Sequence, residues 1–301
     1  MSLRSTPLVA ALALVLLLPG SALAAKKAQP DLYVSLGDSY ASGYQPTAQG
    51  MGRNTRKGFA HQLPALAKKH GYDLELVNFG CAGATTISLL EAKGCNPKAL
   101  ALGGETYPAT SQLRAAEKFV RANRKRVALI TISIGGNDVT ACARAADPVA
   151  CVTAATKTIQ KNVGETAKRL RKAAGAKVRI TGITYPDVLL GGYLSPDQAQ
   201  KDMAKLSIVA FRSLINPALK RAYAGAGARF VDVTAASGAY GSFDATTNLP
   251  PYGTIPTPVA KVCQLTFFCQ FTDIHPRTTG YALIADLVAK TLPRRKRSAG
   301  A

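Results

Sequence analysis

Short apolar runs rich in β-branched residues alternate with longer amphipathic stretches along most of the chain. The short runs predict strands at residues 31–36, 73–79, 126–134, 177–184 and 228–233, and the amphipathic stretches predict helices at residues 59–70, 111–124, 148–174, 195–223 and 278–292. The third run (RVALITISI) is apolar nearly throughout, as is typical of a central strand covered on both faces. This alternation predicts an α/β fold in which helices cover both faces of a parallel sheet. Pro217 is expected to kink or divide the fourth helix.

The N-terminus has the pattern of a secretory signal peptide at residues 1–24. Arg4 precedes the apolar run Leu8–Leu18, and Ala22–Ala24 forms a small-x-small cleavage pattern. The apolar run is shorter than the roughly 20 residues that span a bilayer, which disfavours the alternative of a membrane anchor. We therefore expect a secreted protein, with one domain at residues 30–292. With 47% hydrophobic residues, the chain is not intrinsically disordered.

The chain is strongly basic. Its formal net charge is +21, and removing Arg4 and the four basic residues of the tail at 293–301 still leaves +16. Such a surface favours contact with anionic wall polymers or lipid headgroups, although a basic surface that serves solubility, with a frayed tail, explains the same charge. No motif for specific nucleic-acid binding is present.

The six cysteines are expected to form disulfides, because the chain is exported. Their spacing favours the local pairs Cys81–Cys95, Cys142–Cys151 and Cys263–Cys269, the first of these mostly by exclusion. The alternative is a zinc site, but the sequence has neither a C-x2-C nor an H-E-x-x-H motif and contains only three histidines. We expect no metal and no cofactor.

Candidate chemistry follows the predicted strands, since ligands of parallel sheets bind beyond the carboxyl ends of the strands. Ser39 lies in the turn Gly37–Tyr40 after the first strand, and the small-residue loop 80–86 follows the second. The segment 135–138 (GGND) follows the third strand, and His275 precedes the last helix. Each feature alone is also typical of an ordinary turn or helix start.

Together and in this order, the four motifs resemble the SGNH hydrolase superfamily, also called GDSL esterases and lipases. GDSY at residues 37–40 matches the first block of that family, Gly83 the second, Asn137 the third and His275 the last. The resemblance covers about residues 32–292, and the local sequences around the motifs are most similar to those of secreted actinobacterial members with disulfides. It implies a three-layer α/β/α sandwich around a parallel, mostly five-stranded sheet, and hydrolysis of ester bonds.

The resemblance also implies a role for each of these residues. Ser39 is the nucleophile and His275 the general base, because a serine hydroxyl needs a base to accept its proton. The N–H groups of Ser39 and Gly83 and the side chain of Asn137 form the oxyanion hole, which stabilises the negative charge of the tetrahedral intermediate.

The acid departs from the family pattern. The family commonly carries it three residues before the histidine, where this chain has Thr272; Asp273 lies two residues before. In an extended segment that shift points a side chain to the opposite side. Asp273 can reach the imidazole if the loop bends; otherwise a backbone carbonyl orients the ring of a Ser-His dyad.

We expect a secreted, monomeric serine esterase or lipase acting on small-molecule or lipid esters. The alternatives are a carbohydrate deacetylase of the same fold and a non-catalytic basic module that binds wall or membrane surfaces. The long segment 235–271, rich in Gly, Pro and aromatic residues, either walls an acyl pocket beside His275 or covers an edge of the sheet.

Overall fold

The computed structural model describes residues 29–295. The expected signal peptide and residues 296–301 of the basic tail lie outside this part. The centre of the fold is a five-stranded parallel sheet in the order β4-β1-β5-β6-β7. Its strands are β1 (Asp31–Gly37), β4 (Leu74–Asn78), β5 (Val127–Ser133), β6 (Arg179–Ile183) and β7 (Arg229–Val231). Each lies within one of the predicted strand regions or extends it by one residue, and β5 is central, as expected.

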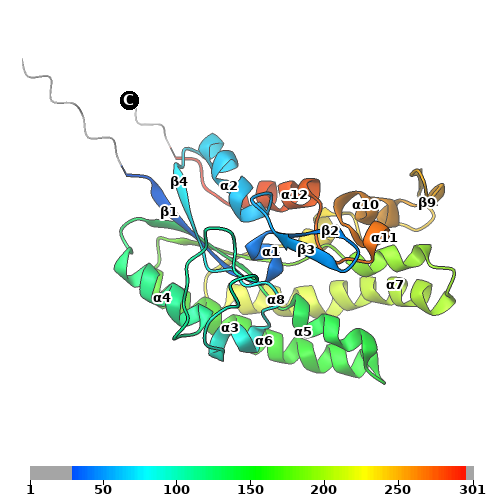
Figure 1. The fold of residues 1–301 in the computed structure, drawn as a ribbon, viewed down its shortest axis with the longest axis horizontal. Coiled ribbons are helices and arrows are strands. Elements are labelled where there is room, and N and C mark those ends of the chain that lie inside the picture. Colours follow the sequence, from blue (N-terminus) through cyan, green and yellow to red (C-terminus); the bar gives the residue numbers. More distant parts are fainter. Residues whose placement is uncertain (1–28, 296–301) are drawn as a thin grey trace, which may run out of the picture.

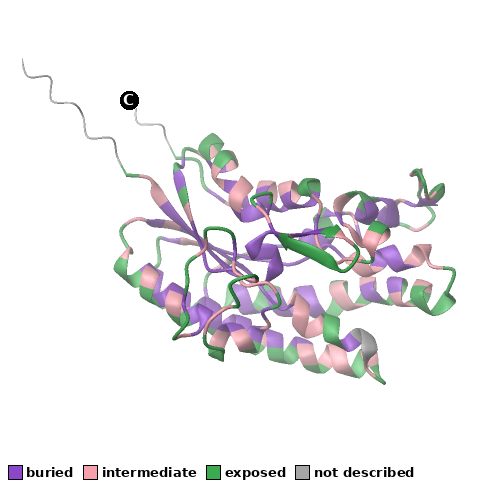
Figure 2. Cartoon of the chain, in the orientation of Figure 1, coloured by how far each residue is buried: buried purple, intermediate pink, exposed green. Residues whose placement is uncertain are grey.

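Helices cover both faces of this sheet (Figure 1). One face carries α2 (Phe59–Ala67) and α12 (Thr278–Ala289), and the other carries α3 (Thr86–Glu91), α4 (Gln112–Ala122), α6 (Pro148–Ala174) and α8 (Asn216–Ala224). Figure 2 shows the strands buried and the helices exposed on their outer sides. The expected three-layer α/β/α architecture is confirmed. None of the helices between residues 29 and 295 is both long and apolar enough to cross a bilayer.

The helical stretch predicted at 195–223 is divided in two. It consists of α7 (Gln198–Ala210), a π-helical turn at Phe211–Ile215, and α8, whose first turn contains Pro217. Because proline has no N–H, the carbonyl one turn earlier lacks its usual helical partner, and the wider π turn lies directly before this position.

Shorter elements lie around the main layers. They are α1 (Ser39–Ser42), the hairpin β2 (Tyr44–Ala48) and β3 (Met51–Asn54), α5 (Gly136–Thr140), α9 (Val233–Ala236), the hairpin β8 (Thr246–Asn248) and β9 (Thr254–Pro256), α10 (Thr257–Leu265) and α11 (Phe268–Phe271). Three 3₁₀ helices occupy Lys68–His70, Ala141–Arg144 and Val188–Leu194. The structure joins Cys81 to Cys95, Cys142 to Cys151 and Cys263 to Cys269, the same pairs that the spacing favours.

The strand order places a topological switch point between β1 and β5. The chain leaves β1 toward β4 on one side and returns to β5 on the other, so the loops after β1 and β5 diverge. Such a divergence leaves a crevice at the carboxyl ends of the two strands, where ligands of open α/β sheets bind. The loops that carry Ser39 and Asn137 leave the sheet at this crevice.

Candidate active site

Ser39 is the first residue of α1 and is buried. The turn before it requires Gly37, which has a φ of +137° and at which any Cβ atom would overlap the Ser133 carbonyl of the neighbouring strand. Gln112 fixes the same glycine, accepting from its N–H at 2.8 Å and donating to its carbonyl at 3.0 Å. Asp38 caps α1 by accepting a hydrogen bond from the Tyr40 N–H at 3.0 Å.

Gly83 lies in the loop between β4 and α3 and is exposed. Its φ is +83°, a conformation that favours glycine, and a Cβ atom at this position would have open space around it. Thr85 then starts α3 through a reciprocal capping pair with Ser88. The Gly83 backbone is therefore accessible, as the expected role of its N–H requires.

Asn137 lies in α5, directly after Gly135 and Gly136 at the end of β5. Its side-chain amide donates one hydrogen bond to the Ala84 carbonyl at 2.8 Å. A side-chain amide has two N–H bonds, so a second one is left to donate. The contact therefore fixes the amide against the loop that carries Gly83.

The two backbone donors at the other expected positions also lack partners. Among the described residues, nothing accepts a hydrogen bond from the N–H of Ser39 or of Gly83. An oxyanion hole consists of such preorganised donors, which bind the charge that develops in the transition state. The described part of the chain thus has free donors at all three expected positions.

His275 and Asp273 are in direct contact. The carboxylate lies 2.7 Å from Nδ1 of the imidazole and also accepts from the His275 backbone N–H at 2.9 Å. These contacts form an Asx turn, in which a carboxylate accepts from the backbone N–H two residues later, so the chain leaves the extended form at Asp273. Burial raises the pKa of Asp273, but the hydrogen bonds and charge of His275 outweigh burial and hold the pKa below its usual value.

The histidine loop is held against the segment that carries Ser39. The Tyr40 hydroxyl donates to the Ile274 carbonyl at 2.7 Å, and the Gln45 amide donates to the Pro276 carbonyl at 3.1 Å. The ring of Tyr44 lies over the imidazole, with the ring centres 4.4 Å apart. Within residues 29–295, the Ser39 hydroxyl makes no hydrogen bond to His275; in free enzymes such bonds often tighten only when substrate binds.

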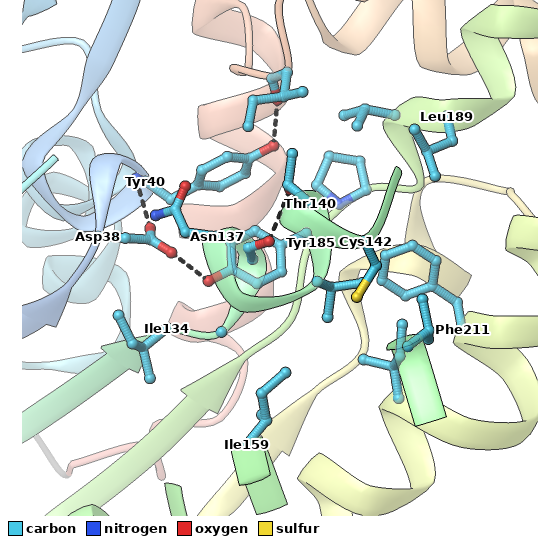
Figure 3. Close-up of a pocket in the computed structure, with 18 of the residues that line it drawn as sticks. Asp38, Tyr40, Ile134, Asn137, Thr140, Cys142, Ile159, Tyr185, Leu189 and Phe211 are labelled. Carbon is cyan, nitrogen blue, oxygen red and sulfur yellow. Dashed lines mark hydrogen bonds between the residues drawn. The ribbon is translucent and has the colours of Figure 1, made fainter. Parts of the chain in front are cut away.

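Asp38 and Tyr185 also belong to the site, although the GDSY motif gave Asp38 no role of its own and Tyr185 lies in no motif. The Tyr185 hydroxyl donates to the Asp38 carboxylate at 2.6 Å, linking the loop after β6 to the turn of Ser39 (Figure 3). Burial raises the pKa of Asp38 to about 7, against the lowering effect of its hydrogen bonds. The Asp38 carboxylate thus stabilises the turn that carries Ser39. Only the position of Tyr185 after a predicted strand could have pointed to it.

A cavity of ≈ 120 Å³ adjoins these residues. Asp38, Ser39 and Asn137 line one part of it, and side chains of α6 and of the π turn line another (Figure 3). The segment 235–271 contributes nothing to this lining, so the expectation that it walls an acyl pocket is wrong for this cavity. Its buried side chains instead pack against the 3₁₀ helix Val188–Leu194. The segment also supports the histidine loop, because the Phe267 N–H donates to the His275 carbonyl at 3.0 Å.

Comparison with known proteins gives one family and several similar structures. The GDSL-like Lipase/Acylhydrolase family model matches residues 35–283. No curated protein matches the chain. The lipase Lip_vut3 from a goat rumen metagenome is similar in structure, with a TM-score of 0.53 and 15% identity over 87% of this chain and 98% of that chain. At this identity the likeness shows a common fold.

Two esterase structures are more distant. Axe2, an acetylxylan esterase from Geobacillus stearothermophilus, has a TM-score of 0.45 and 16% identity over 87% of this chain and 94% of its own. An aryl esterase from M. smegmatis has a TM-score of 0.42 and 14% identity over 87% of this chain and 97% of its own.

Proposed function

The chain belongs to the GDSL-like lipase/acylhydrolase family and is a carboxylic ester hydrolase, and we propose that it is a secreted serine hydrolase that works through an acyl-enzyme on Ser39. The observation that carries the proposal is the contact of the His275 imidazole with the Asp273 carboxylate at 2.7 Å, in a loop that is hydrogen-bonded to the segment of Ser39.

In the first half of the reaction, the Ser39 oxygen attacks the ester carbonyl carbon while Nε2 of His275 takes up the hydroxyl proton. Asp273, bound to Nδ1, fixes the orientation of the ring and stabilises the imidazolium that forms. The carbonyl oxygen becomes negatively charged and accepts hydrogen bonds from the two free N–H groups and from the Asn137 amide.

The tetrahedral intermediate then collapses. The bond to the alcohol oxygen breaks, and the imidazolium gives its proton to that oxygen, so the alcohol leaves and the acyl group stays on Ser39. Water repeats the sequence: His275 accepts a proton from it, hydroxide attacks the acyl carbon, and Ser39 recovers its proton as the acid departs.

Two alternative functions predict a different substrate or no reaction at all. A carbohydrate deacetylase would use the same residues but cleave acetyl groups from sugars. A binding module for anionic wall or membrane surfaces is favoured only by the net charge of +21, and such a module has no use for an aligned imidazole and carboxylate.

A serine-directed phosphonate probe tests the proposal. Wild-type protein should be labelled on Ser39 and should hydrolyse a nitrophenyl ester, whereas Ser39→Ala should do neither and should unfold at the same temperature as wild type. Ser242→Ala, at an exposed position, is the matched control and should behave as wild type. An unlabelled, inactive wild type would contradict the proposal and support the binding module.

A further inference from the structure

The cavity beside Ser39 extends well beyond the space that an acetyl group needs. We propose that it is the binding site of the substrate's acyl chain, and that the enzyme prefers esters of medium-length aliphatic acids. This inference rests on the proposed acyl-enzyme at Ser39 and adds the class of acid that the site accepts.

Apolar side chains from several separate segments form most of the cavity wall (Figure 3). Ile134 at the end of β5 and Ile159 of α6 are each 1% exposed, so this part of the wall is deeply buried. Val152 of α6, Leu189 of the 3₁₀ helix and Phe211 of the π turn are also part of it. An aliphatic chain leaving water for such surroundings gains free energy with each buried methylene.

Apart from Ser39 and Asn137, which serve the reaction, the polar side chains in the wall are already paired. The Tyr185 hydroxyl donates to Asp38, the Tyr40 hydroxyl to the Ile274 carbonyl, and the Thr140 hydroxyl to the Gly136 carbonyl at 2.8 Å. A sugar or a charged acid in this cavity would lose its water without gaining partners, which costs free energy. The wall therefore selects a plain hydrocarbon chain.

The position of the histidine decides which half of the ester enters the cavity. His275 must protonate the alcohol oxygen as it leaves, so the alcohol lies on the histidine side of Ser39. The cavity is lined by Ser39, Asn137 and Thr140; the neighbouring Ile274 also reaches its wall, whereas His275 itself does not. The group that points away from the histidine and into the cavity is the acyl chain.

The cavity volume limits the length of that chain. An apolar cavity of about 150 Å³ accommodates benzene, a molecule of six carbons. The cavity here measures ≈ 120 Å³. We therefore expect the best fit for chains of about six to eight carbons, counting the carbonyl carbon at Ser39, and a poorer fit for much longer ones.

The first experiment measures kcat/KM for nitrophenyl esters from acetate to palmitate. It should rise from acetate to hexanoate or octanoate, by up to about fourfold for each methylene that becomes buried, and fall again for palmitate. A profile with its maximum at acetate, in an enzyme that Ser39→Ala inactivates, would overturn the acyl site while leaving the proposed function intact.

Two matched variants on α6 locate the site. Val152→Phe should fill the cavity and lower the ratio of kcat/KM for the octanoate ester to kcat/KM for the acetate ester by on the order of tenfold or more. Val149→Phe makes the same change one turn away, at a side chain that is 53% exposed and outside the cavity wall, and should match wild type. Equal losses for acetate and octanoate in Val152→Phe would contradict the assignment.

Binding provides a readout that does not depend on turnover. By calorimetry, Ser39→Ala should bind sodium octanoate more tightly than sodium acetate, and adding Val152→Phe should abolish that difference. If Ser39→Ala binds octanoate no better than acetate, the acyl site is wrong. If octanoate binds but the wild type hydrolyses no ester, the proposed function fails and the cavity assignment stands.

Discussion

At the scale of single residues, an Asx turn at Asp273 decides how the candidate acid is used. The carboxylate accepts from the His275 backbone N–H at 2.9 Å and lies 2.7 Å from Nδ1 of the ring. In an extended chain, the side chains of residues 273 and 275 would point to the same side but start about 6.6 Å apart. The turn draws the carboxylate onto the imidazole.

This geometry predicts a large loss of activity in Asp273→Asn. The asparagine amide cannot replace a carboxylate that stabilises the imidazolium, and such a change in a triad costs about 10⁴-fold in kcat. We expect a loss of about 10³–10⁴-fold in ester hydrolysis, measured with purified, folded protein.

Thr272→Gly, at the residue before Asp273, is the control and should keep most of the activity, because Thr272 has a φ of +53° and glycine readily adopts this left-handed conformation. A loss of less than about tenfold in Asp273→Asn, compared with the triad value, would instead favour a Ser-His dyad oriented by a backbone carbonyl.

The sequence motifs pointed to Ser39, Gly83, Asn137 and His275 because each lies in a short pattern at a strand or helix end. They left the partner of His275 open, because residue type alone does not fix whether the chain turns at Asp273. They missed Tyr185 because its contact with Asp38 spans 147 residues and lies within no motif.

At the scale of secondary-structure elements, a buried polar cluster joins three helices beside the oxyanion donors. The Thr86 N–H and hydroxyl, at the start of α3, both donate to Asp138 of α5. The same hydroxyl accepts from the Asn162 amide of α6 at 3.0 Å. Since Gly83 precedes α3 and Asn137 lies in α5, this cluster fixes the two donor segments relative to each other.

Thr86→Val should therefore reduce catalysis as well as stability. Valine keeps the shape of threonine but removes its hydroxyl, leaving Asp138 and Asn162 each short of a hydrogen bond. We expect kcat to fall about tenfold, the equivalent of roughly 1.4 kcal/mol of transition-state stabilisation, with KM nearly unchanged.

Two further variants separate positioning from simple destabilisation. Thr86→Ser restores the hydroxyl and should recover kcat. Thr166→Val removes another buried hydroxyl, one that donates only to the Asn162 carbonyl one turn earlier in α6, and should lower stability without lowering kcat. A Thr86→Val enzyme with wild-type kcat would show that the cluster supports the fold alone.

The main elements could be predicted from the sequence because each carries its own periodicity, as in the apolar run of β5 and the amphipathic α6. The hairpin β2–β3 was missed, since Gln45-Pro46-Thr47 and Gly50-Met51-Gly52 have no strand pattern. The cavity was missed for another reason: its wall combines α5, α6 and the π turn, and no local pattern records how such distant segments pack.

At the scale of the whole molecule, the fold buries two carboxyl groups near the carboxyl ends of β1 and β6. Asp38 and Asp187 are 1% and 0% exposed, and burial raises the pKa of each to about 7. Asp38 accepts two hydrogen bonds. Asp187 accepts one from the Ser207 hydroxyl at 2.8 Å, while its Oδ1 has no partner among the described residues. Asp187 is therefore the less well satisfied of the two.

The raised pKa of Asp187 makes folding stability depend on pH in a definite direction. Its usual pKa is 3.8 and its pKa in the fold is about 7, so between these values the folded chain binds a proton that the unfolded chain does not. Stability contributed by this group is fully present below about pH 4 and is lost as the pH rises to about 7. Asp38 acts in the same direction.

Asp187→Asn should remove the part of this pH dependence that comes from Asp187, because an amide of the same shape stays neutral. One pH unit of difference in pKa corresponds to about 1.4 kcal/mol, so the variant should be more stable than wild type by about 2–4 kcal/mol at pH 8 and by little at pH 4. Urea unfolding at pH 4 and pH 8 measures both differences in stability. Asp202→Asn, at an exposed aspartate on α7, is the control and should leave the stability unchanged at both pH values. A variant that is less stable than wild type at pH 8 would mean that the Asp187 carboxylate is stabilised in the fold, against the argument from its burial and its unpartnered oxygen.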